Sequence, residues 1–213
     1  MSGLEIHLAS RSARRFEWLK AEFEGKYGSL SAEGLQSKEP EARFGLTVKE
    51  QVSEILSFKL EAAIFESNLG IQSGVPSAEI IIVADTLVGD PDDPNISLGK
   101  PSDKVEAAAM LIRLRGRRHN VWSGTAIIYR EGSQWRSESF VENATVEFED
   151  YTPEILQDLI ESESWKGKAG GYDMAGQMRQ HCRLIIGEEV CVLGFAPLAI
   201  KRLEQLLTQN RRK

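Results

Sequence analysis

The stretch IIIVADTLVGDPDD, residues 80–93, decides the fold of this chain. Its first five residues are continuously apolar, a pattern typical of a strand that is covered on both faces of a sheet. Asp85 and Thr86 follow this run directly. The Asp85 carboxylate either takes part in chemistry or only begins a solvated loop, and the residues around it decide between these alternatives. The later acids indicate a solvated turn that leads back toward Lys100: Asp90, Asp92 and Asp93.

Strand and helix periods alternate on both sides of this stretch. Residues 4–10 predict a strand, and residues 12–23 predict a helix with Ser12 as its N-cap. A second helix is predicted over residues 48–67, where apolar residues share one face. Asp103 and Glu106 form the sequence pattern of a capping box ahead of a third helix. The later elements are a pair of strands over 121–148, a short helix after Thr152, a hairpin over 182–194 with its turn at Gly187, and a helix over 197–207.

These alternating periods predict an α/β protein with a mixed, twisted sheet and flanking helices. The chain has 213 residues and 41% hydrophobic content, which fits one domain, 1–213, that can divide into two lobes. The longest apolar runs are far shorter than the ~20 residues that a membrane span requires. The first residues from Met1 also lack the cationic start and apolar stretch of a signal peptide. We therefore expect a cytoplasmic protein without a membrane partner. The net charge of −6 argues against nucleic-acid binding through a broad basic surface.

Cysteine and histidine usage indicates no structural metal centre. Cys182 and Cys191 flank the predicted hairpin turn and could face each other across two strands, but without a secretion signal we expect reduced, packed thiols. Neither these cysteines nor the three histidines show the spacing of zinc ligands.

The segment LASRSARR, residues 8–15, lies where a strand is predicted to turn into a helix. Free backbone N–H groups, the Ser10 hydroxyl and two guanidinium groups could converge there on an anion. The alternative is an ordinary helix start with capping serines and solvated arginines, and the octapeptide alone does not decide between them. Arg14 and Arg15 in a first helical turn oppose the helix dipole, which favours an anionic partner.

Three lysines also stand at conspicuous places. Lys59 interrupts the apolar face of the second helix, where it either snorkels to solvent, the commoner explanation, or points toward a phosphate. Lys100 sits in a rigid turn between Gly99 and Pro101. Lys168 opens a glycine-rich segment that either is a flexible surface loop or lets a ligand approach the backbone closely. A polyphosphate ligand would explain all these cations in an acidic chain.

Six ordered segments resemble the hallmark segments of the Maf family of nucleotide pyrophosphatases. The resemblance covers about residues 8–198, and its segments are LASRSARR, VADTLV, GKPSDKVEAAAML, GRRHNVWSG, KAGGYDMAG and GFAPL. It implies a two-lobed α/β fold related to the inosine triphosphatase-like superfamily, a nucleotide cleft between the lobes, and often a homodimer. The implied reaction is hydrolysis of a nucleoside triphosphate to the monophosphate and pyrophosphate, aided by a divalent cation, Mg²⁺ or Mn²⁺.

The resemblance also implies roles for individual residues. Asp85 matches the family's catalytic acid, which accepts a proton; it could alternatively ligate the metal, whose other ligands stay open. The triphosphate and cleft positions fall on Ser10, Arg14, Arg15, Lys59, Lys100 and Lys168. Such residues suit the chemistry, because attack on phosphorus needs a positioned water and cations that offset charge on the pyrophosphate leaving group.

Arg14 and Thr86 match the selectivity positions of the family's dTTP/UTP branch, but the third position, usually glutamine there, is Ala175, with Gln177 two residues later. The family's acidic pair is also missing if Gln36 and Ser37 occupy its place, and Glu33, Glu39 or Glu41 could substitute. Two hypotheses therefore remain. The first is a house-cleaning pyrophosphatase that acts on dTTP, UTP or a modified nucleotide. The second is a catalytically weak nucleotide-binding regulator linked to cell division.

Overall fold

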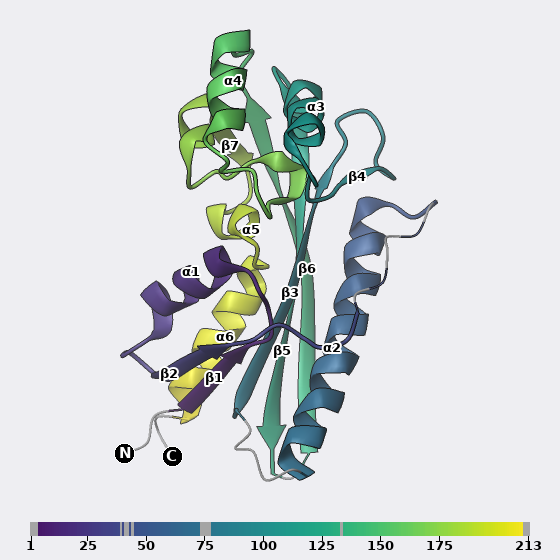
Figure 1. The fold of residues 1–213 in the computed structure, drawn as a ribbon. Helices are drawn as coiled ribbons and strands as arrows, with labels where there is room; N and C mark the ends of the chain where they lie inside the picture. Colours follow the sequence, from purple (N-terminus) through teal and green to yellow (C-terminus); the bar gives the residue numbers. More distant parts are fainter. Residues whose placement is uncertain are drawn as a thin grey trace.

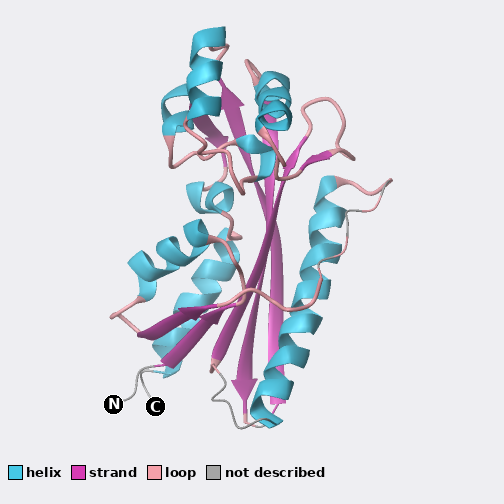
Figure 2. Ribbon diagram, viewed as in Figure 1, coloured by secondary structure: helices cyan, strands magenta, loops and turns pink. Residues whose placement is uncertain are grey.

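The computed structural model describes residues 4–38, 40, 43, 45–72, 78–132 and 134–210, and they form one mixed sheet with helices on both faces (Figures 1 and 2). This confirms the α/β class predicted from the sequence. The division into two lobes stays a prediction. No helix in these described ranges is long and apolar enough to cross a membrane. The strands are β1 (Leu4–Leu8), β2 (Gly28–Ala32), β3 (Ile80–Gly89), β4 (Ser97–Leu98), β5 (Arg118–Glu131), β6 (Gln134–Phe148) and β7 (Cys182–Ile186).

The helices agree closely with the sequence patterns. The side chains of Ser12, Asp103 and Thr152 accept hydrogen bonds from backbone N–H groups of the first turns, as N-caps do. The Glu106 carboxylate of the predicted capping box reaches the backbone N–H of Ser102 instead of that of Asp103. The helices are α1 (Ala13–Phe23), α2 (Val48–Gln72), α3 (Lys104–Leu114), α4 (Pro153–Glu161), α5 (Glu189–Leu193) and α6 (Pro197–Asn210), with 3₁₀ turns η1 (Ala169–Gly171) and η2 (Gln177–His181).

Strand β3 lies at the centre of the sheet, whose order is β2-β1-β3-β5-β6-β7, with β4 also pairing with β3. The apolar run at its start is buried on both faces, as its unbroken hydrophobic pattern predicts. On one face it packs with residues of α1 and α6, and on the other with residues of α2. Figure 1 shows α2 running along one side of the long strands while α1 and α6 cover the opposite side.

The register leaves part of one edge of β3 without a neighbouring strand. Strand β1 pairs in parallel with residues 80–82, and β4 pairs with Val88 and Gly89. Between these ladders, residues 83–87 pair only with β5 among the described strands. Asp85 and Thr86 therefore sit at a gap in the sheet edge, which α1 approaches from one face and α2 from the other.

The acidic turn after β3 is not simply solvated, as the sequence had indicated. The Asp90 side chain is 5% exposed and accepts two hydrogen bonds from the Arg113 guanidinium. These hydrogen bonds lower the pKa of the Asp90 carboxyl. Asp92 forms ion pairs with Arg113 and Arg117. The turn is thus fastened to the end of α3, because Arg113 in the last turn of this helix and Arg117 just after it supply partners for the acids.

The hairpin predicted over residues 182–194 is wrong. Only its first half is a strand, β7, and after a turn at Gly187 the chain forms the short helix α5. Acids at the beginning of α5 favour a helix there, because they stand near the positive end of the helix dipole. Cys182 and Cys191 are both free, as expected, and burial raises the pKa of their thiols to about 11 and about 12.

A glycine on β5 sets how closely α2 can approach the sheet, and its replacement tests this packing. A Cβ atom added at Gly124 would lie 2.8 Å from Val52 Cγ1 and 3.2 Å from a methyl group of Leu56. We expect Gly124→Ala to lower the free energy of unfolding by about 1–3 kcal/mol, because overpacking forces a shift of helix or strand. Urea denaturation measures the loss.

The matched control for this substitution is Gly99→Ala, where an added Cβ meets no described heavy atom within 4 Å. It should change stability by less than about 0.5 kcal/mol. Equal stability of the two variants would contradict the proposed close approach of α2.

Candidate active site

The backbone carbonyl of Ala84 is the meeting point of two buried cations. Arg15 Nη1 donates to this oxygen from α1 at 3.0 Å, and Lys59 Nζ donates to it from α2 at 3.4 Å. Both side chains belong to buried residues, 8% and 6% exposed. Helices on opposite faces of the sheet thus deliver positive charge to the same point of β3, at the gap in its edge.

Lys59 forms a short ion pair with Asp85. Its Nζ lies 2.7 Å from Oδ1 of the carboxylate, and both side chains are largely shielded from water. The snorkelling explanation for Lys59 is therefore wrong: the lysine interrupts an apolar helix face because that face packs against a carboxylate. Oδ2 of Asp85 makes no hydrogen bond with a described residue, so this oxygen can accept a proton or contact a ligand.

The Arg15 guanidinium joins α1 to β3 and to the turn after α5. Besides Ala84 O, it donates to the carbonyl of Gly194 at 3.0 Å, to Thr86 Oγ1 at 2.8 Å and to Ser10 Oγ at 3.4 Å. Gly194 has φ 114°, and a Cβ there would come within 2.7 Å of Arg15 Nε, so the position suits glycine alone. Ser10 and Arg15 are thus joined to β3 by protein contacts, and a direct contact of Arg15 with phosphate stays a prediction.

Thr86 belongs to a directed chain of hydroxyl groups on the face opposite Asp85. Its Oγ1 lies 2.9 Å from Ser123 Oγ, and Ser123 donates its only hydroxyl hydrogen to the Cys191 carbonyl at 2.7 Å. Thr86 must therefore donate to Ser123 while it accepts from Arg15. Sequence reasoning missed Ser123, although it lies in one of the six quoted segments, because the identity of its neighbours appears only once β3 and β5 are in register.

Asp173 joins two further predicted cations. Arg14 Nη1 lies 3.5 Å from its Oδ1, and Lys168 Nζ lies 3.6 Å from its Oδ2. The same carboxylate accepts the backbone N–H of Ala175 at 3.1 Å, which places the predicted selectivity position next to this group. Asp173 could not be found from the sequence, since one acid in a glycine-rich segment forms no pattern.

The glycine-rich segment is anchored rather than a flexible surface loop. The N–H of Gly170 donates to the carbonyl of Gly99 at 2.9 Å, and a Cβ at Gly170 would lie 2.9 Å from a methyl group of Val88. This contact also places Lys100, the next residue after Gly99, beside the segment. Lys100 makes no ion pair with a described residue and is exposed.

A buried histidine contacts Tyr172 of the glycine-rich segment. His119 Nε2 lies 3.0 Å from Tyr172 Oη, and its ring packs edge-on against Phe148 and Tyr172. Its Nδ1 is buried without a hydrogen-bond partner among the described residues. Burial lowers the pKa of His119 to about 3 and raises that of Tyr172. The ring is therefore neutral and structural, and the residue adjoining Tyr172 is Asp173.

Residues 36 and 37, where the resemblance implies an acidic pair, are held in place by an acid from α2. The Glu66 carboxylate on α2 accepts the backbone N–H groups of Gln36 and Ser37 and the Ser37 hydroxyl, at 2.8–3.2 Å. Glu33 is exposed, and Glu39 and Glu41 lie outside the described residues. In the described part of the chain, no group of three or more His, Cys, Asp or Glu side chains could hold a metal ion.

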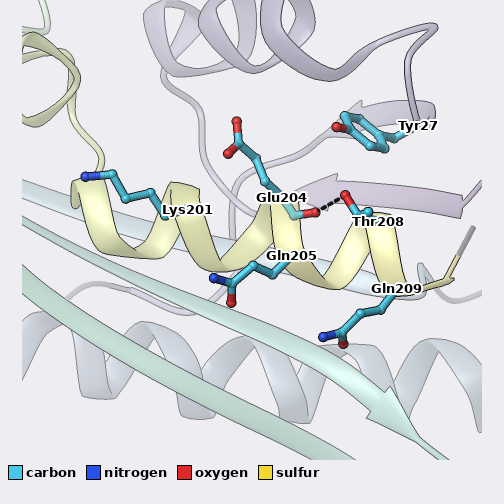
Figure 3. Close-up of a pocket in the computed structure, with 6 residues that line it drawn as sticks. All are labelled: Tyr27, Lys201, Glu204, Gln205, Thr208 and Gln209. Carbon is cyan, nitrogen blue, oxygen red and sulfur yellow. Dashed lines mark hydrogen bonds between the residues drawn. The ribbon is translucent and has the colours of Figure 1, made fainter.

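The structure places most of the predicted residues in two groups of contacts. Arg15, Thr86 and Ser10 are linked on one face of β3, and Lys59 and Asp85 on the other. Arg14 and Lys168 are joined through Asp173 beside Ala175, and Lys100 stands nearby. The pocket in Figure 3 lies elsewhere: it is lined by Tyr27 and residues of α6 and contains none of the predicted site residues.

Comparison with known proteins gives consistent family matches. The family described as Maf-like protein matches residues 5–210. A protein from Carboxydothermus hydrogenoformans named dTTP/UTP pyrophosphatase is 31% identical over 206 residues, which cover 97% of this chain and 98% of that protein. One of the same name from Bacillus cereus is 31% identical and covers 96% of this chain and 95% of its own.

Two more distant comparisons add little. A human protein named probable bifunctional dTTP/UTP pyrophosphatase/methyltransferase protein is 30% identical over 63% of this chain and 22% of its own. A solved HAM1 protein structure from Coxiella burnetii covers 70% of this chain and 74% of its own, with 14% identity and a TM-score of 0.37, which is too loose a likeness to support any assignment.

The buried His119 makes a specific prediction for stability against pH. With a folded pKa of about 3 and an unfolded value near 6.5, the unfolded chain binds the extra proton between these values. Stability is therefore lost as pH falls below 6.5. We expect His119→Gln to be less stable than wild type at pH 7.5, with the gap shrinking by about 1.4 kcal/mol per pH unit below 6.5.

Urea denaturation at pH 7.5, 6.5, 5.5 and 5.0 measures this gap. The control is His181→Gln, at a histidine that is partly exposed beside Glu149. A gap between wild type and His119→Gln that stays constant across this range would show that folding does not lower the pKa of His119.

Proposed function

We propose that this chain, which belongs to the Maf-like protein family, hydrolyses a nucleoside triphosphate to the nucleoside monophosphate and pyrophosphate. Family membership gives the general class, a hydrolase of nucleotide phosphoanhydride bonds. The finer proposal concerns the substrate and the residues that act on it. The observation that carries it is the short Asp85–Lys59 ion pair at the gap in the edge of β3, together with the second group, in which Arg14 and Lys168 share a single carboxylate.

In the proposed reaction, water attacks the α-phosphorus and the bond to the bridging oxygen of pyrophosphate breaks. Asp85 accepts the proton of the water through Oδ2, while Lys59 fixes the carboxylate through Oδ1. Arg14, Lys100 and Lys168 offset the negative charge that builds on the leaving pyrophosphate. Arg15 positions these groups, because its bonds to Ala84 and Thr86 fix α1 against β3.

A divalent cation fits this site only together with its substrate. Mg²⁺ is typically bound through one or two carboxylates plus substrate phosphates rather than by an all-protein cage. Asp85 meets that requirement, since one of its oxygens has no described partner. As the alternative to its role as proton acceptor, we propose that Asp85 and phosphate oxygens would hold Mg²⁺ or Mn²⁺, and that the metal would supply further charge neutralisation on the phosphates.

We propose that the nucleobase of the substrate is a pyrimidine and that the substrate is dTTP or UTP. Two observations support this: the relatives are named dTTP/UTP pyrophosphatase, and Arg14 and Thr86 are both present. Ala175 can contribute only its backbone to base recognition. The weak-regulator alternative is favoured by a different observation, the use of Glu66 to hold residues 36 and 37 where the resemblance implies an acidic pair. The homodimer implied by the resemblance stays a prediction.

Removal of the Asp85 charge tests the catalytic assignment. Asp85→Asn keeps an oxygen that can accept from Lys59 but no longer accepts a proton from water. We expect kcat for pyrophosphate release from dTTP or UTP with Mg²⁺ to fall by about 10²–10⁴-fold. Binding of a non-hydrolysable triphosphate should persist.

The control is Asp92→Asn, which removes one negative charge from an ion pair beside α3 and should retain activity within about twofold. Equal pyrophosphate release by wild type and Asp85→Asn would remove Asp85 from catalysis. Nucleotide binding by the wild type without any pyrophosphate release would instead support the regulator.

Restoring an amide at position 175 tests the proposed base preference. Ala175→Gln adds a donor and an acceptor that can pair with the N3–H and carbonyl of uracil or thymine. We expect kcat/KM for UTP relative to CTP to rise by up to about tenfold, the worth of one good hydrogen bond. Ala175→Met, of similar length but without these groups, should give no such gain. An equal gain in both variants would attribute the effect to bulk.

A further inference from the structure

Asp173 occupies a position where a carboxylate is unexpected if the surrounding cations bind phosphate. Its Oδ1 lies 3.5 Å from Arg14 Nη1 and its Oδ2 lies 3.6 Å from Lys168 Nζ, so one carboxylate bridges the start of α1 and the glycine-rich segment. The carboxylate is largely shielded from solvent, as are both cations. A carboxylate and a phosphate present similar oxygens to such groups, and both cannot occupy the same donors.

Arg14 has hydrogen-bonding capacity that Asp173 does not use. Its guanidinium makes one long contact with Asp173, and its Nε is buried without a hydrogen-bond partner in the described part of the chain. A buried unsatisfied donor costs free energy, and burial of a charged donor costs more. Arg15, the next residue, differs in this respect, because it donates to four protein oxygens. Arg14 is therefore poised for an acceptor that brings more oxygens than one carboxylate.

We propose that Asp173 is an internal competitor of the substrate: its carboxylate holds Arg14 and Lys168 in place in the free protein and is displaced by the phosphate oxygens of the bound ligand. The inference rests on the proposed function only for the class of ligand, a polyphosphate. Asp173 thereby sets the affinity of the site, and it returns to the two cations when the ligand leaves, which weakens retention of the pyrophosphate product.

The bond from the Ala175 N–H to Asp173 Oδ1 makes a clean test possible. Asp173→Asn keeps an oxygen for this turn but removes the negative charge. The probe is inorganic tripolyphosphate in EDTA, measured by isothermal titration calorimetry, so that neither turnover nor metal binding contributes. We expect the Kd of Asp173→Asn to be roughly three- to tenfold lower than that of wild type, as the release of two partly shielded ion pairs implies.

Two further variants identify the cause of that change. Asp92→Asn makes the same change in net charge at an ion pair outside the site, and its Kd should stay within about twofold of wild type. In an Arg14→Gln background, the added Asp173→Asn should give less than half of the gain on a logarithmic scale, because one of the two competing cations is gone. Near-ultraviolet circular dichroism checks that the glycine-rich segment keeps its packing in each variant.

A Kd for Asp173→Asn that equals or exceeds the wild-type value would overturn the proposal, and so would the same gain in Asp92→Asn or a lack of tripolyphosphate binding by both wild type and Asp173→Asn. Pyrophosphate release is measured separately. If the wild type releases none while Asp173→Asn still binds tripolyphosphate more tightly, the proposed reaction fails and the competition by Asp173 stands.

Discussion

The buried guanidinium of Arg15 is the interaction on which the rest of the site depends. It ties the start of α1 to the backbone of β3 at Ala84, to the Thr86 side chain and to the turn at Gly194. A charge this deeply buried is tolerated only when its donors are satisfied, and here four oxygens accept from it. Because these oxygens come from segments far apart in the chain, the guanidinium fixes where Arg14 and the N-terminal turn of α1 stand relative to β3.

Successive side chains of β3 point to opposite faces of the sheet, so neighbouring residues make different contacts. Asp85 faces α2 and meets Lys59, whereas Thr86 faces α1 and α5 and joins the chain of bonds that ends at Cys191. A one-residue slip of β3 would exchange these faces and leave the charged groups of both helices without partners. The register against β5 is therefore as important to the site as the identity of either residue.

Much of this could be read from the sequence, and the failures have physical reasons. The apolar run of β3, the N-caps and the amphipathic helices are local patterns, so they were predictable. Two adjacent arginines look alike in sequence, but only the folded chain shows that Arg15 is consumed by protein oxygens while Arg14 is not. The prediction of a hairpin from Cys182 was wrong because α5, which forms its second half, has five residues and is too short to show a helical period in the sequence. Asp173 gave no signal, since its partners are distant in sequence.

The distribution of ion pairs explains how an acidic chain can present a site for an anion. Arginines of the basic stretch around Gly116 are each paired with an acid: Arg113 and Arg117 with the turn after β3, Arg115 with Asp150 and Arg118 with Glu147. Their positive charge is therefore offset locally by these acids. At the site, by contrast, one carboxylate serves both Arg14 and Lys168 at long range, and Lys100 has no described partner. Cations outnumber the acids that face them there, so local pairing, and not the net charge of −6, determines where the chain keeps cations without a matching acid.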